Sequence, residues 1–135
     1  MPSPSLPAAL RDFLEAPNLV SVATLGRDGA PQATVVWFLL EGERILINTK
    51  AGRVKTLNLD RDPRVALTVY DCANPYRSVQ LRGVVSERRD GAAASEDIHR
   101  LSRRYAGHEY REPDDRISYL IAINSWSSWG MPELD

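Results

Sequence analysis

The stretch that decides the fold is Ile45–Leu59, ILINTKAGRVKTLNL. Its first residues are apolar and favour a strand, and the small pair Ala51-Gly52 then predicts a turn into a short helix. Arg53 and Lys55 lie near the start of that helix. Backbone N–H groups at a helix start, with cations beside them, favour binding of a phosphate. The stretch therefore predicts a phosphate site, although the same cations would also suit an ordinary solvated helix face.

Composition sets the bounds on what the chain can be. Its 135 residues are 43% hydrophobic and 26% charged, with a formal net charge of -1, which predicts one globular domain over residues 1–135. No overall field favours nucleic acid or an anionic membrane. The longest apolar run, Val35–Leu40, is too short to span a bilayer. With no signal-like start and only Cys72 as a cysteine, we expect a cytoplasmic protein.

Hydrophobic periodicity along the rest of the chain predicts a strand-dominated domain. The expected helices are a short one through Leu10 and Leu14, one at Arg53–Leu59 and one through Ile98 and Tyr105; the expected strands are Leu19–Leu25, Gln32–Leu40, Arg44–Asn48, Arg64–Tyr70, Tyr76–Arg88 and Ile117–Ile123. Asp28-Gly29 is a hairpin signal, and Gly83 indicates a bend or bulge in the fifth strand. Hairpins in place of crossovers predict a mainly β fold, an antiparallel barrel of about six strands with short peripheral helices.

The ordered motifs of the chain resemble one known family. They are Leu19–Leu25 with Gly29–Gln32, Val35–Phe38, Arg53–Leu59 with Arg61–Val65, Val79–Gly83, and Arg104-Tyr105. Together they resemble the split β-barrel flavin and deazaflavin oxidoreductases related to pyridoxamine 5′-phosphate oxidase, in particular the actinobacterial branch that uses coenzyme F420. The resemblance covers nearly the whole chain and implies a homodimer with cofactor sites between the subunits.

The same resemblance implies which residues bind the cofactor. Arg53 and Lys55 match the pair that holds the phosphate, with Lys50 nearby, and Asn48 and Thr49 would line the ring and the ribityl chain. The remaining positions lie on two strands: Gln32, Val36 and Trp37 on the second, and Tyr76, Ser78 and Gln80 on the fifth. For Trp37 and Tyr76, simple strand packing is the alternative role. Trp126 and Trp129 would either line the partner's substrate pocket or fix an aromatic tail to the barrel.

The function that the resemblance implies is hydride transfer between reduced F420 and an unsaturated or quinone-like small molecule. The cofactor carries the hard step, so we expect no catalytic acid–base pair and no metal site; His99 and His108 lack metal-ligand spacing. Arg53-Val54-Lys55 stands where flavin mononucleotide (FMN) oxidases often have Ser-Arg-Lys, and the C-terminal Arg-x-His of pyridoxamine phosphate oxidases is missing. Alternatives are an FMN flavoprotein of this fold, a non-catalytic F420, flavin or haem carrier, and an interaction module.

Overall fold

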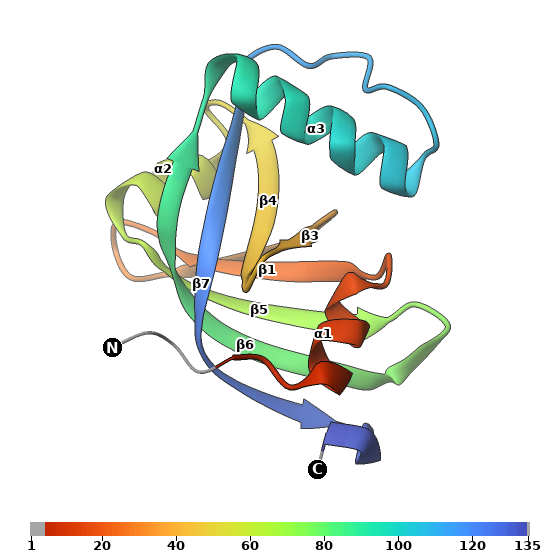
Figure 1. Cartoon of the computed structure of the whole chain (residues 1–135). Helices are drawn as coiled ribbons and strands as arrows, with labels where there is room; N and C mark the ends of the chain where they lie inside the picture. The colour runs from red at the N-terminus through yellow and green to blue at the C-terminus, as the bar shows by residue number, and fades with distance from the viewer. Residues whose placement is uncertain (1–4, 135) are drawn as a thin grey trace.

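The computed structural model describes residues 5–134, which form a single antiparallel sheet with helices around it (Figure 1). In chain order the elements are α1 (Ala8–Glu15), β1 (Leu19–Leu25), β2 (Pro31–Val36), β3 (Leu39–Glu41), β4 (Arg44–Lys50), α2 (Val54–Arg61), β5 (Arg64–Asp71), β6 (Asn74–Arg89), α3 (Gly91–Tyr105), β7 (Arg116–Trp129) and a 3-10 turn (Pro132–Leu134). The strand order is β2-β1-β5-β6-β7-β4-β3. The mainly β, split-barrel prediction is confirmed.

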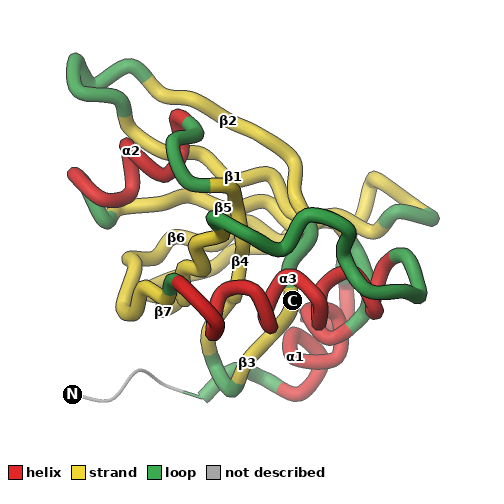
Figure 2. The backbone as a smooth tube through the Cα atoms, turned by 90° about the horizontal axis from the view of Figure 1, so that it is seen from above, coloured by secondary structure: helices red, strands yellow, loops and turns green. Residues whose placement is uncertain are grey.

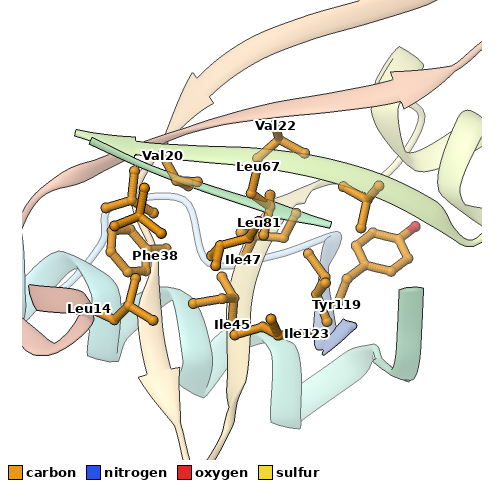
Figure 3. Close-up of a cluster of buried hydrophobic side chains, with 14 of the residues drawn as sticks. Leu14, Val20, Val22, Phe38, Ile45, Ile47, Leu67, Leu81, Tyr119 and Ile123 are labelled. Carbon is orange, nitrogen blue, oxygen red and sulfur yellow. The ribbon is translucent and has the colours of Figure 1, made fainter. Parts of the chain in front are cut away.

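The two longest strands, β6 and β7, join one half of the barrel, made of β2, β1 and β5, to the other half, made of β4 and β3. One edge of β7 pairs with β4 while the other pairs with β6, and β6 pairs in turn with β5. The inward faces of both halves then meet in one core, which Figure 3 shows with Val22 and Leu67 from one half and Ile45 and Ile47 from the other. Strict alternation of buried residues along β1 fits a sheet with one face in the core.

Gly83 lies at a bulge between β6 and β7, as its sequence context predicts. Arg82 pairs with Ser125 and Gly83 pairs with Ile123, so Asn124 has no partner in the register. A Cβ atom at residue 83 would lie 2.2 Å from the carbonyl oxygen of Ala122. Only glycine therefore allows the two paired strands to approach each other this closely.

Two predicted boundaries are wrong. The expected strand Gln32–Leu40 is two strands, β2 and β3, which raises the number from about six to seven. The break falls at Trp37 and Phe38, where the hydroxyl group of Tyr105 lies 3.0 Å from the carbonyl oxygen and 3.4 Å from the nitrogen of Phe38. The final strand also continues past Ile123 to Trp129, so the first part of the aromatic tail expected at Trp126–Asp135 pairs with β6; Asp135, at its end, lies outside the described residues.

The helices lie on the periphery of the strands, as Figure 2 shows for α2 and α3. Asn58 of α2 donates a hydrogen bond to Thr24 of β1 (3.0 Å), and Arg61 donates to the carbonyl oxygen of Leu25 (2.6 Å). Ile98 and Leu101 of α3 form a second buried cluster with apolar side chains of β4 and β7. None of the helices within residues 5–134 is long and apolar enough to cross a membrane.

Candidate functional site

The turn between β4 and α2 presents the two cations of the R-x-K motif. Gly52 adopts a φ of +86°, a left-handed conformation that suits glycine, and α2 begins at Val54 with Arg53 at the N-cap. No side chain caps this helix start. The turn is fixed by a hydrogen bond from the nitrogen of Ala51 to the carbonyl oxygen of Asp115 (2.7 Å). The segment before β7 thus lies against the turn.

A cavity of about 410 Å³ opens beside this turn. It is lined by seven of the residues that the sequence assigns to cofactor binding: Gln32, Val36, Asn48, Thr49, Lys50, Arg53 and Lys55. Strand β2 supplies the first two, and β4 with the following turn and helix supplies the rest. Thr34, Val54, Tyr110 and Arg116 also line the cavity, although the sequence interpretation did not include them. We call this space the cationic cavity.

Positive charge in the cationic cavity has little compensation. Lys50 lies 4.0 Å from Glu112, but Arg53, Lys55 and Arg116 form no ion pair with any other residue between 5 and 134. Burial, followed by the charges of Arg53 and Arg116, holds the pKa of Lys55 below its ordinary value. Burial likewise lowers the pKa of Arg116. A bound anion would relieve the repulsion among these three side chains.

Strand β2 contributes two polar atoms that have no partner in the described structure. The Oε1 atom of Gln32 and the Oγ1 atom of Thr34 are buried and make no hydrogen bond to residues 5–134. Such orphaned atoms are rare in folded proteins because their desolvation is unfavourable. Oε1 is an acceptor, whereas a hydroxyl group can donate or accept. A ligand that combines hydroxyl groups with an anionic group would satisfy both these atoms and the cations.

Asn48 lines the cationic cavity, and its amide group also bonds to the protein itself. It is buried, its Nδ2 atom donates to the carbonyl oxygen of Ala94 (3.0 Å) and to Ser118 (2.9 Å), and its Oδ1 atom accepts a bond from Nε of Arg116 (2.8 Å). The donors and the carbonyl oxygen of this amide are thus occupied by the protein. Although Asn48 lines the cavity, its visible task is to hold Arg116.

A second cavity, of about 400 Å³, adjoins the first and is more aromatic. The two share Val36, Asn48, Tyr110 and Arg116, and the second adds Trp37 with apolar residues of β1, β2 and α3. The ring of Trp37 stacks parallel to Tyr105 at 5.3 Å between centroids and meets the edge of Tyr110 at 6.3 Å. Both proposed roles of Trp37 therefore remain compatible with its position, since it packs on α3 and also lines what we call the aromatic cavity.

The three predicted residues of β6 lie apart from both cavities. Tyr76, Ser78 and Gln80 line neither space as residues 5–134 outline them. Gln80 donates to Ser78 (2.9 Å), which confirms that these two side chains share one side of the strand. Tyr76 is 70% exposed and lies near Trp129, which is 62% exposed (6.3 Å between ring centroids). Within a single chain, the predicted cofactor residues thus form two separate groups.

No group of three or more His, Cys, Asp or Glu side chains among the described residues is arranged to hold a metal ion. His99 instead accepts a hydrogen bond from the backbone nitrogen of Tyr110 (3.0 Å) and lies 3.1 Å from Glu109. These contacts fix the segment that carries Tyr110 into both cavities. Cys72 is exposed in the turn between β5 and β6.

Comparison with known proteins gives one family and several solved relatives. The sequence profile of the family described as Pyridoxamine 5′-phosphate oxidase matches residues 6–130. A solved F420 reductase is 29% identical, with a TM-score of 0.80, over 90% of this chain and 98% of that protein. A conserved hypothetical protein from Mycobacterium tuberculosis is 28% identical, with a TM-score of 0.75, over 98% of this chain and 89% of its own.

A curated relative is the pyridoxine/pyridoxamine 5′-phosphate oxidase of Kineococcus radiotolerans, which is 35% identical over 71 residues. That match spans 53% of this chain and 31% of the relative. The similarity to the two solved structures therefore covers a far larger share of both compared chains than the similarity to this oxidase does.

Proposed function

Because the chain belongs to the pyridoxamine 5′-phosphate oxidase family, an oxidoreductase family, we propose that it transfers a hydride between reduced coenzyme F420 and an unsaturated or quinone-like organic molecule. The observation that carries the proposal is the cationic cavity, in which three cations that form no ion pair within the described part of the chain lie beside two orphaned polar atoms. The similarity to an F420 reductase over nearly the full length of both chains supports the choice of deazaflavin. The physiological acceptor stays open.

The residues present fit such a cofactor. Arg53 and Lys55 would bind its phosphate, and Gln32 and Thr34 would bind hydroxyl groups of its ribityl chain. Trp37 and Val36, at the aromatic cavity, would orient its flat ring and exclude water from one face. When bound, the reduced cofactor supplies the hydride. The protein has to bind, orient and dehydrate the reactants, so the proposal needs no acid–base residue.

FMN is the second candidate, because its phosphate and ribityl hydroxyl groups would suit the same cavity. The curated relative, a pyridoxine/pyridoxamine 5′-phosphate oxidase, adds support for this alternative. A direct comparison of the affinities of F420 and FMN for the purified protein separates the two. Tight binding of FMN with weak binding of F420 would replace the first candidate by the second. Binding of neither compound would refute both.

The phosphate assignment is tested with two ligands and two substitutions. FO, the deazaflavin that ends at the ribityl chain and has no phosphate, serves as the matched ligand for F420. Loss of one charge-assisted contact costs about 1.5–3 kcal/mol, so Arg53→Ala and Lys55→Ala should each weaken F420 by roughly 10- to 150-fold. Neither should change the affinity for FO. Unchanged F420 affinity in both variants would contradict the assignment.

Binding alone does not distinguish an enzyme from a carrier, so turnover needs its own test. Reduced F420 is mixed with the protein and with a panel of quinones and activated alkenes, and its oxidation is followed by absorbance. An enzyme turns over at least one acceptor many times per site, and the Arg53→Ala variant loses this activity at low cofactor concentration. A protein that binds F420 tightly but oxidises it with no acceptor is a carrier.

We also propose a homodimer in which β6 of one subunit completes the cationic cavity of its partner. This arrangement accounts for the separation of Tyr76, Ser78 and Gln80 from the other predicted residues, and for the exposed aromatic pair of Tyr76 and Trp129. Light scattering should give twice the mass of 15.1 kDa. Mixing Arg53→Ala and Tyr76→Ala proteins should restore sites in mixed dimers, since one site then carries neither substitution. A monomer, or no recovery on mixing, would contradict the proposal.

A further inference from the structure

Arg116 is the first residue of β7 and lies opposite Lys50 in the β4–β7 register. It is about half-buried, and it lines both the cationic and the aromatic cavity. Its guanidinium group lies 5.1 Å from the centre of the Tyr110 ring. No carboxylate among residues 5–134 forms an ion pair with it, although the Tyr110 side chain and the charge of Glu112 favour its charged form. A half-buried guanidinium group without an ion-pair partner among the described residues is suited to a bidentate contact with an oxyanion.

The position of this guanidinium group is fixed from the opposite side. Asn48 accepts the bond from Nε of Arg116 at 2.8 Å, and the orientation of its amide is determined because Nδ2 has two acceptors, Ala94 and Ser118. Ser118 in turn donates to Asp97 (2.8 Å), which is 3% exposed. The chain of bonds thus runs from Asp97, which also pairs with Arg89 and Arg100, to the wall of the cavity.

We propose that Arg116 is an oxyanion-binding residue of this site and that Asn48 is its positioning residue. The proposal rests on the proposed function for the identity of the ligand, and it adds to the R-x-K pair a third cation from a different strand. Burial, and after it the charges of Arg53 and Arg116, lower the pKa of Lys55; the part due to charge agrees with an anion shared by or placed between these side chains. The anion is either the cofactor's phosphate or an acidic group elsewhere on the cofactor.

The test compares Arg116→Gln with a control that loses the same charge. Arg27→Gln, in the exposed turn between β1 and β2, is the matched control. Arg116→Gln should weaken F420 by about 10-fold or more and leave FO unchanged, whereas Arg27→Gln should affect neither. Arg116→Lys keeps the charge but loses the bond to Asn48, so it should recover only part of the affinity. Equal weakening of F420 and FMN identifies the phosphate; weakening of F420 alone identifies a group beyond it.

The role of Asn48 is tested by a double-mutant cycle. Asn48→Leu removes the acceptor of the bond from Nε of Arg116 without adding a charge, and should reduce the ratio of F420 to FO affinity in the wild-type background. In the Arg116→Gln background the same substitution should have no further effect on that ratio. An equal effect in both backgrounds would show that Asn48 does not act through Arg116. FO affinity and the melting temperature separate this role from general damage to the fold.

Inorganic phosphate provides a second readout that does not depend on the cofactor. Phosphate should raise the melting temperature of the wild-type protein and of Arg27→Gln, and Arg116→Gln should lose most of this shift. If Arg53→Ala weakens F420 but Arg116→Gln changes neither F420 binding nor the phosphate shift, the inference about Arg116 is wrong and the proposed function stands. If F420 fails to bind while the phosphate shift depends on Arg116, the function is wrong and the inference stands.

Discussion

Replacement of Gly83 by alanine should destabilise the protein strongly, because β6 and β7 lie too close together at this bulge to admit a side chain. The new Cβ would lie 2.2 Å from the carbonyl oxygen of Ala122 and 2.9 Å from Cγ2 of Ile121, whereas ordinary contact begins at 3.4 Å, a shortfall of about 1.2 Å. Backbone atoms have to move to relieve it. Overpacking costs about 1–3 kcal/mol, and a weakened ladder hydrogen bond adds about 1 kcal/mol. We expect a loss of about 3 kcal/mol.

Urea unfolding and thermal melting measure this loss, which corresponds to a melting temperature roughly 10 °C lower. Gly42→Ala is the matched control: its φ is +63° and nothing lies within 4 Å of the added Cβ, so only the left-handed backbone costs energy, about 1 kcal/mol. Gly83→Ala should also weaken cofactor binding, because β7 carries Arg116. A loss no larger than that of Gly42→Ala would refute the steric reasoning.

Three other substitutions give sharp expectations. Lys55→Met should stabilise the cofactor-free protein at pH 7, because the folded state lowers the pKa of this lysine and so disfavours its charged form. The gain in unfolding free energy should shrink as the pH rises through the folded pKa towards the ordinary value of 10.5. Urea titrations at pH 7 and pH 10 measure both values. Tyr105→Phe removes the hydroxyl partner of the Phe38 backbone and should cost about 1–3 kcal/mol by the same titration, while the stack with Trp37 persists. Asp97→Asn should destabilise by about 2 kcal/mol or more and reduce F420 affinity without changing FO affinity, since Asp97 compensates buried charge and holds Ser118.

The sequence was sufficient for the order of elements because hairpins and helices carry local signals. Leu19–Leu25, the Asp28-Gly29 turn and the bulge at Gly83 all follow from residues within a few positions. The break between β2 and β3 does not follow from nearby residues. Val35–Leu40 is uniformly apolar, and the hydroxyl group that satisfies the broken backbone comes from Tyr105, 67 residues from Phe38. A contact of that sequence separation leaves no periodic signal.

The same distinction applies to the site. The R-x-K motif is local, and it led to the turn beside the cationic cavity. Arg116 was missed because it stands at the start of a strand, among residues with ordinary polarity, and its relation to Asn48 spans 68 residues. Tyr76 and Ser78 were assigned to the cofactor site together with the residues of β2 and β4 because of the family resemblance. That resemblance also implies a homodimer. In the proposed homodimer, β6 of the partner subunit would bring these residues to the site, from which they are separate within one chain.

The arginines of this site differ from other partly buried arginines in whether they form ion pairs. This difference distinguishes the site more sharply than the R-x-K motif does. Arg89 and Arg100 are partly buried, and both contact carboxylates of Glu41 and Asp97, which raises the pKa of each guanidinium group. Arg116 is also partly buried but has no carboxylate partner among the described residues, and burial shifts its pKa in the opposite direction, below its ordinary value. In a chain with 18 acidic residues and 17 basic ones, carboxylates were available to neutralise it. An unpaired, rigidly held cation costs folding energy, and binding of an anionic ligand is the process that would recover that energy.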